Sequence, residues 1–203
     1  MRQIVVATRN RGKVAEMAAV LAALPVEVLA LDQFADTTEA EETGDTFAAN
    51  AILKATHYAL ETGKACLADD SGLEVDALGG APGVYSARYA GEGASDAACN
   101  AKLLAALADV PDGERTARFR SVLAYVDPDG SLITADGTCE GVILREARGD
   151  GGFGYDPLFY MPALGKTLAE LSVAEKNAVS HRGQAMRNMA GKLSGFYRAH
   201  RSD

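Results

Sequence analysis

The chain opens with a stretch, residues 4–13, that decides its fold class: IVVATRNRGK. The apolar run Ile4–Ala7 is typical of a short buried strand, and the polar residues 8–12 predict a loop. From Lys13 to about Leu24 the apolar residues recur with helical spacing. A strand, a polar loop and a helix in this order are the opening of an α/β protein.

The next segments continue the alternation of strand and helix. Residues 26–31 predict a second strand, and an acidic stretch over residues 39–45 leads to a helix that begins near Thr46. We expect that helix to reach about Glu61 and to be closed by Gly63. Residues 65–68 then predict a buried strand, and the polar run Asp69-Asp70-Ser71-Gly72 marks its end, so carboxylates gather at its carboxyl end.

The second half of the chain changes character. Residues 77–93 have the glycine-rich composition of a loop, and Ser95 caps a helix that runs to about Leu107. Residues 116–144 predict an antiparallel hairpin or meander, and residues 149–157 form a second glycine-rich loop. The C-terminal part is helical, with a capping box at Ser172 and Glu175. Because no linker separates these segments, we expect residues 1–203 to form a single domain.

Composition excludes several classes of protein. A formal net charge of −8 over 203 residues gives no general attraction to nucleic acid. No window approaches the ~18 to 20 apolar residues that a membrane helix needs. The N-terminal apolar run is too early and too short for a signal peptide. We therefore expect a cytoplasmic protein without a nucleic-acid or membrane partner. The cysteines Cys66, Cys99 and Cys139 are too widely spaced for a zinc site and read as small buried residues.

Two polar clusters suggest binding of a phosphate and of a metal ion. Thr8, Asn10 and Lys13 lie where a strand gives way to a helix, which is a place that holds phosphate, although a solvated loop with a surface lysine fits the same residues. Asp69 and Asp70, with the separate Glu41-Glu42 run, offer hard oxygen ligands without a nearby Cys or His. Such ligands suit Mg²⁺, although an acidic strand end can also be merely solvated.

A third and a fourth cluster suggest recognition of a flat base. The loop of residues 152–157 carries Phe153 and Tyr155 among glycines, so it can offer an aromatic face, although such residues also anchor loops. Lys176 and the run Ser180-His181-Arg182 add donors and positive charge, or simply brace a helix. A nucleotide bound with Mg²⁺ would use all four clusters.

Six motifs in order along the chain closely resemble the inosine triphosphate pyrophosphatase family. They are residues 8–13 (TRNRGK), 41–55 (EETGDTFAANAILKA), 68–73 (ADDSGL), 79–88 (GGAPGVYSAR), 152–157 (GFGYDP) and 175–185 (EKNAVSHRGQA). The resemblance implies Mg²⁺-dependent hydrolysis of ITP, dITP, XTP and dXTP to the monophosphate and pyrophosphate by a cytoplasmic homodimer. It also implies an α/β fold with a mixed, elongated central sheet flanked by helices, in two lobes with a cleft between them.

The resemblance also implies roles for individual residues. Asp70 would be the general base and a metal ligand, and Glu41 would be a second metal ligand. The residues that would bind the substrate are Thr8, Asn10, Lys13, Ser71, Phe153, Gly154, Tyr155, Asp156, Lys176, His181 and Arg182. A buried donor, from Arg182 or from nearby backbone, would pair with the 6-oxo group that ITP and XTP have and ATP lacks. One departure is Arg9, which stands where the family usually has a small residue.

Two other functions fit parts of the pattern. A related Maf-like pyrophosphatase would prefer smaller, modified pyrimidine bases and would need the Ser180-His181-Arg182 cluster less. A nucleotide-binding regulator without turnover would keep the phosphate loop but would not need Asp69 and Asp70 together with Glu41. Release of pyrophosphate from a panel of triphosphates distinguishes the three.

Overall fold

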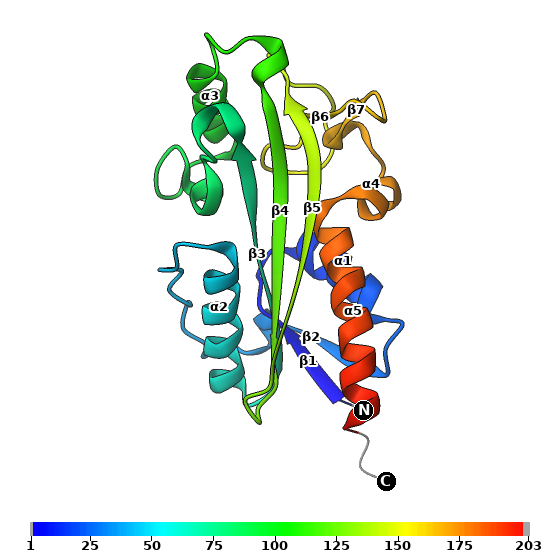
Figure 1. The fold of residues 1–203 in the computed structure, drawn as a ribbon. Helices are drawn as coiled ribbons and strands as arrows, with labels where there is room; N and C mark the ends of the chain where they lie inside the picture. The colour runs from blue at the N-terminus through cyan, green and yellow to red at the C-terminus, as the bar shows by residue number, and fades with distance from the viewer. Residues whose placement is uncertain (1, 201–203) are drawn as a thin grey trace. The chain divides into compact units, whose positions relative to one another are not determined.

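The computed structural model describes residues 2–200, and contacts divide the chain into two compact units. Unit 1 comprises residues 2–70, 121–137 and 182–200, and unit 2 comprises residues 71–120 and 138–181. The chain crosses from one unit to the other four times, within three strands and at the start of the last helix, rather than through linkers. Figure 1 follows the chain from its N-terminal strand to its C-terminal helix.

Within residues 2–200, seven strands form one mixed sheet in the order β2-β1-β3-β4-β5-β6-β7. β1 pairs in parallel with β2 and β3, whereas β6 is antiparallel to β5 and β7. The mixed sheet and its flanking helices confirm the expected α/β class. The strands are β1 (Arg2–Val6), β2 (Val26–Ala30), β3 (Ala65–Val75), β4 (Thr116–Val126), β5 (Leu132–Ile143), β6 (Phe159–Met161) and β7 (Lys166–Thr167).

In unit 1, helices cover both faces of the sheet. α1 (Arg11–Leu21) and α5 (His181–Ala199) lie on one face, and α2 (Phe47–Thr62) lies on the other (Figure 1). The core beneath α1 and α5 includes Ile4, Val6, Met17, Leu21, Leu67, Leu123, Ala185, Met189 and Leu193, all fully buried. The apolar residues of α5 recur every three to four positions, so one stripe of the helix faces the sheet.

Unit 2 has its own hydrophobic core. α3 (Asp96–Ala106) packs there through Cys99 and Leu103, against sheet residues that include Phe119 and Phe159. The short helix α4 (Val173–Val179) begins at the capping box of Ser172 and Glu175, which confirms that prediction. Each unit therefore buries a separate set of apolar side chains.

Local signals located most helix ends correctly. Thr46 caps the start of α2, Gly63 closes it with φ +63°, and Ser95 caps α3, as expected. Residues 76–78 and 83–88, predicted as loop, form short 3₁₀ helices. The larger error concerns β3, which does not stop at Ala68 but continues through the aspartates to Val75.

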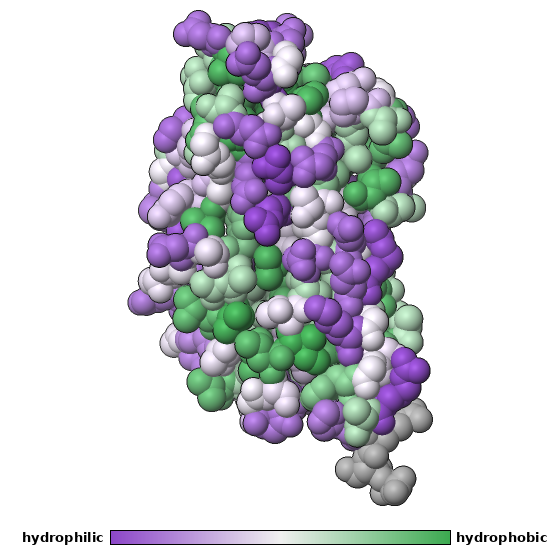
Figure 2. Space-filling view, viewed as in Figure 1, coloured by the Kyte–Doolittle hydropathy of each residue, from purple (hydrophilic) through white to green (hydrophobic). Residues whose placement is uncertain are grey.

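Residues 2–200 contain no helix that is both long enough and apolar enough to cross a bilayer. Hydrophilic and hydrophobic side chains are interspersed over the face shown in Figure 2.

The three cysteines should resist thiol reagents while the protein is folded. Cys66, Cys99 and Cys139 are all buried and unbridged. Burial raises the pKa of the Cys66 thiol to about 12 and that of the Cys139 thiol to about 11, so neither forms the reactive thiolate at neutral pH. We expect no reaction with Ellman's reagent at pH 8 and three thiols per chain once guanidinium chloride unfolds the protein. Rapid labelling of the native protein would contradict this burial.

Candidate active site

The two consecutive aspartates of β3 lie in different surroundings. Successive side chains of a strand point to opposite faces of its sheet. Asp69 accordingly contacts Lys13 of α1 and Arg182 of α5, on the face that these helices cover. Asp70 is surrounded by groups from α2 and from the segment before it. The expectation that both carboxylates meet at a strand end is therefore wrong, because the strand does not end there.

Asp69 is the centre of a buried ionic network. The Lys13 Nζ atom lies 2.8 Å from Asp69 Oδ2, and the Arg182 Nε atom lies 3.4 Å from the same oxygen. Ser121 on β4 donates its hydroxyl to Asp69 Oδ1 at 2.7 Å. Arg182 also pairs with Glu16 of α1 at 3.1 Å. The network thus joins two helices and two strands of unit 1.

The charges in this network keep Asp69 ionised. Burial by itself would raise the pKa of the Asp69 carboxyl, but the positive charges of Lys13 and Arg182 hold that pKa well below its ordinary value. Hydrogen bonds from Lys13 and Ser121 act in the same direction. Asp69 is thus a permanent anion that fixes the position of Lys13, and it is unsuited to accept a proton.

Asp70 has the opposite character. Burial raises the pKa of its carboxyl to about 6, and the negative charges of Glu42 and Asp69 add to this, although Lys54 and Asn50 oppose it. Its Oδ2 atom is buried and has no hydrogen-bond partner within residues 2–200. A buried carboxylate that titrates near neutrality can accept a proton during turnover.

The groups around Asp70 come from α2 and the acidic segment that precedes it. Lys54 of α2 pairs with Glu42 at 2.8 Å and donates to the Asp69 backbone carbonyl at 3.2 Å. Asn50, one turn earlier, is fully buried and accepts a hydrogen bond from the Gly44 N–H at 2.7 Å. A Cβ atom on Gly44 would lie 2.7 Å from Asn50 Oδ1, so glycine is needed for this close approach. The acidic segment is therefore held against the start of α2.

The donor set around Asp70 fits a hard cation. Asp70 Oδ2 is buried without a hydrogen-bond partner in the described part of the chain, and native structures rarely leave such an oxygen unsatisfied. No group of three or more His, Cys, Asp and Glu side chains forms a cage among residues 2–200. Mg²⁺ binds through one or two carboxylates and keeps its waters or substrate oxygens, so Asp70 and a nearby glutamate suffice.

The structure favours Glu42 over Glu41 as the glutamate nearest Asp70. Glu42 pairs with Lys54, and its charge acts on the Asp70 carboxyl. Glu41 is exposed. Consecutive residues of an extended segment point in different directions, so two adjacent glutamates in a sequence do not reveal which one faces Asp70. The assignment of Glu41 as a metal ligand stays a prediction.

The loop before α1 is built as an anion site. Asn10 caps the helix by accepting the Lys13 backbone N–H at 3.2 Å, and the Asn10 N–H donates to Thr8 Oγ1 at 3.1 Å. The first N–H groups of a helix have no partner within it and attract phosphate. Arg9, which departs from the family's small residue, is exposed.

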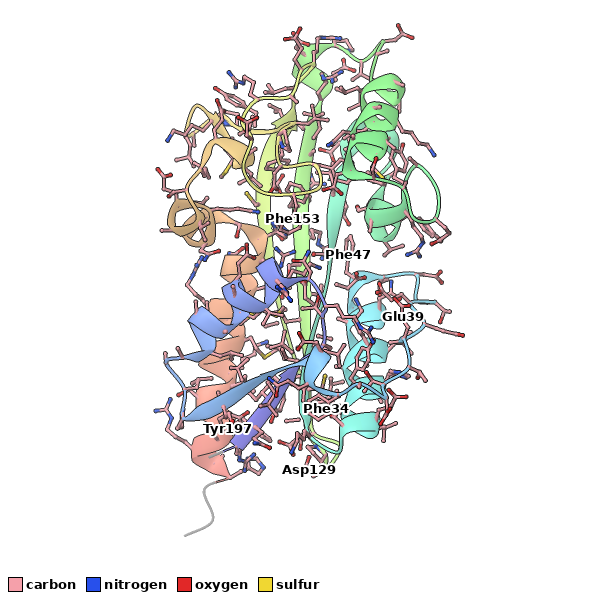
Figure 3. All side chains as sticks on the ribbon, turned by 180° about the vertical axis from the view of Figure 1, so that it is seen from behind. Phe34, Glu39, Phe47, Asp129, Phe153 and Tyr197 are labelled. Carbon is pink, nitrogen blue, oxygen red and sulfur yellow. The ribbon has the colours of Figure 1, made fainter. Side chains whose placement is uncertain are left out.

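A cavity in unit 1 connects this loop with the acidic segment. Its volume is about 170 Å³, and its lining includes Thr8 and Arg9 from the loop, Glu39 and Glu42 from the acidic segment, and Lys54 from α2. Figure 3 labels Glu39 on the acidic segment and Phe47 at the start of α2. The phosphate loop and the groups near Asp70 therefore open onto one cavity.

The predicted base-binding residues gather in unit 2. Lys176 of α4 pairs with Asp156 at 2.7 Å, and both side chains are at least nine-tenths buried. The Lys176 ammonium also lies 4.5 Å from the centre of the Phe153 ring. Phe153 is 37% exposed, and Figure 3 labels it. An aromatic face beside a buried ammonium can stack on a base and donate to its carbonyl oxygen.

The remaining predicted residues divide between the units. Ser71 follows Asp70 in β3 and belongs to unit 2. His181 is buried in unit 2 and stacks on Phe119, with ring centres 4.8 Å apart. Arg182, expected near the base, is in unit 1, and its guanidinium contacts Asp69 and Glu16. A role for Arg182 in reading the base stays a prediction.

Sequence reasoning missed the contributions of Glu16 and Ser121. Glu16 and Ser121 act through Arg182 and Asp69, residues that are 166 and 52 positions away in the chain. No local motif marks such partners.

Comparisons with known proteins decide the family. The model of the Ham1 family matches residues 4–192. The chain belongs to the Ham1 family. A dITP/XTP pyrophosphatase of Desulforamulus reducens is 55% identical, over 96% of this chain and 97% of its own. One of Geobacter sulfurreducens is 57% identical, over 92% and 94%. A HAM1 protein from Coxiella burnetii, of known structure, is 46% identical with a TM-score of 0.89, over 96% of this chain and 100% of its own.

Replacing Asp69 should destabilise this Ham1 chain strongly. Asp69→Asn leaves Lys13 and the buried Arg182 without their shared anion, and removal of one partner from a buried ion pair costs about 3–5 kcal/mol. Urea unfolding measures the loss. Asp109→Asn is the matched control, because Asp109 is exposed, and we expect a change within about 0.5 kcal/mol. Equal stability of the two variants would show that the network contributes little.

Proposed function

We propose that this chain hydrolyses nonstandard purine nucleoside triphosphates (ITP, dITP, XTP and dXTP) to the monophosphate and pyrophosphate, and so clears them from the nucleotide pool. The observation that carries the proposal is the buried Asp70 carboxyl, whose pKa is about 6 and whose Oδ2 atom has no partner among residues 2–200. The relatives that align over nearly the whole chain are dITP/XTP pyrophosphatases.

We propose Mg²⁺ as the cofactor, held by Asp70 and by Glu42 or Glu41. Support comes from the unsatisfied Oδ2 atom of Asp70 and from the carboxylate chemistry of this donor set. When bound, Mg²⁺ would neutralise phosphate charge and make bound water more acidic.

The residues of unit 1 would provide the rest of the reaction. The N-terminus of α1 and the Lys13 ammonium would bind the triphosphate, with Lys13 oriented by Asp69. A water molecule would add to phosphorus and lose its proton to Asp70, while a P–O bond of the anhydride between the α and β phosphates breaks. Lys13 would stabilise the negative charge on the departing pyrophosphate.

The residues of unit 2 would select the base. Phe153 would stack on the purine, and donors beside it, among them the Lys176 ammonium, would pair with the 6-oxo group. Adenine carries an amino donor at that position, so those buried donors would be left without partners. A site built on such pairing can reject the wrong base by about 10⁴-fold.

We also propose that the chain acts as a homodimer in the cytoplasm. Both proposals rest on the family pattern. Size-exclusion chromatography with light scattering tests the first, and fractionation of cells tests the second.

Asp70→Asn should abolish turnover without unfolding the protein. The amide keeps the shape of the carboxyl but cannot accept the water's proton, so we expect kcat for ITP to fall by about 10³-fold or more. The melting temperature should hold, because the carboxyl is already desolvated. Asp109→Asn controls for the loss of one surface charge. Near-normal rates in Asp70→Asn would exclude Asp70 as the base.

A panel of triphosphates tests the reaction itself. Pyrophosphate release should be fast with ITP, XTP and dITP, slow with ATP and UTP, and lost when EDTA removes Mg²⁺. A Maf-like enzyme would favour modified pyrimidines, and a regulator would release no pyrophosphate. Equal kcat/KM for ATP and ITP would refute the pairing argument for the 6-oxo group.

A further inference from the structure

The loop of residues 152–157 in unit 2 is hydrogen-bonded to helix α3 at one residue, Gly154. The Gly154 N–H donates to Asp96 Oδ2 at 2.7 Å, and the Asn100 side-chain amide donates to the Gly154 carbonyl at 2.9 Å. Asp96 and Asn100 are four positions apart, so they lie on one face of α3. Both polar backbone groups of Gly154 are thus bound by one helix.

The conformation of Gly154 explains why outside groups must hold it. Its φ of +60° is a left-handed conformation that glycine adopts at little cost, and the ideal position of a Cβ atom there has no neighbour within 4 Å. Glycine has no side chain through which packing could fix its position. The two hydrogen bonds from α3 hold the Gly154 backbone in place.

The residues on either side of Gly154 are fixed as well. The Phe153 N–H donates to Asp156 Oδ2 at 3.0 Å, and that carboxylate also receives the Lys176 ammonium at 2.7 Å. The Tyr155 hydroxyl donates to the Ser86 carbonyl at 2.7 Å within the buried part of unit 2. The loop backbone is held at successive residues, while the Phe153 ring keeps 37% of its surface exposed.

We propose that Asp96 and Asn100 are positioning residues that set base selectivity by holding Gly154, and through it the Phe153 ring and the Lys176 ammonium. The proposal rests on the proposed function, in which these two groups meet the base. Stacking and hydrogen bonding to a carbonyl both depend on placement, and a shift of about 1 Å can cost about 10²-fold in rate. Loss of these hydrogen bonds to Gly154 would let the loop adopt other conformations, and the preference for ITP over ATP would fall.

Asn100 offers a way to separate this role from folding. Its Oδ1 atom is buried and has no hydrogen-bond partner in the described part of the chain. An unsatisfied buried acceptor costs stability. Asn100→Leu removes that acceptor together with the donor to Gly154 and keeps a similar side-chain volume. If Asn100 served stability alone, its replacement would lower the melting temperature. We instead expect Asn100→Leu to lower selectivity while its melting temperature stays close to the wild-type value.

The experiment compares Asp96→Ala and Asn100→Leu with the wild-type full chain. The readouts are kcat and KM for ITP and ATP, and inhibition by tripolyphosphate, which has phosphates but no base. We expect KM for ITP to rise and the ratio of kcat/KM for ITP over ATP to fall by about tenfold. Inhibition by tripolyphosphate should change less than about twofold, because the phosphate-binding groups belong to unit 1.

Two further variants serve as controls. Asp96→Asn keeps an oxygen acceptor for the Gly154 N–H and should retain most of the selectivity. Asp109→Ala removes an exposed acid just beyond α3 and should behave as the wild type does. Unchanged selectivity in both Asp96→Ala and Asn100→Leu would overturn the proposal.

Hydrogen exchange separates failure of this proposal from failure of the proposed function. Amides of residues 152–156 should exchange at least about tenfold faster in Asp96→Ala and Asn100→Leu than in the wild type. If the wild type releases no pyrophosphate from ITP, the proposed function fails, and the exchange rates still report whether α3 holds the loop. Unchanged exchange in both variants would show that α3 does not hold it.

Discussion

The alternation of side chains along β3 determines what chemistry unit 1 can perform. Neighbouring residues of a strand face opposite ways, so Asp69 and Asp70 cannot share one environment. Asp69 meets two cations and stays charged, whereas Asp70 is desolvated and titrates near neutrality. A loop at this point would let both carboxylates meet the same groups, and the distinction between an anchoring anion and a proton acceptor would disappear.

The ionic network around Asp69 supports the same division. A buried carboxylate is costly unless cations and hydrogen bonds compensate for the lost hydration, and Lys13, Arg182 and Ser121 do so. The Asp69 carboxylate in turn orients Lys13 at the start of α1, beside the N–H groups that would bind phosphate. Asp70 lacks such an abundance of donors, which is why its carboxyl stays basic enough to act.

In unit 2, the Phe153 side chain is partly exposed although its loop is held firmly, a combination that stacking on a base would require. The loop carrying Phe153 is fastened through its backbone to α3 and through Asp156 to Lys176. Gly152 is necessary here, since a Cβ atom on it would collide with the Asp156 carboxylate. Rigidity thus comes from hydrogen bonds, and the ring surface remains available.

The amino-acid sequence by itself determined the features that depend on neighbours along the chain: the strand, loop and helix at the N-terminus, the caps at Thr46 and Ser95, and the motifs that identify the family. Tertiary structure alone decided that β3 continues past Ala68, that Glu42 rather than Glu41 approaches Asp70, and that Arg182 pairs with Asp69. Asp, Ser and Gly have low strand propensity, so local preference predicts an end where pairing in the sheet sustains a strand. Ion pairs between residues more than 100 positions apart arise from packing, which no local pattern encodes.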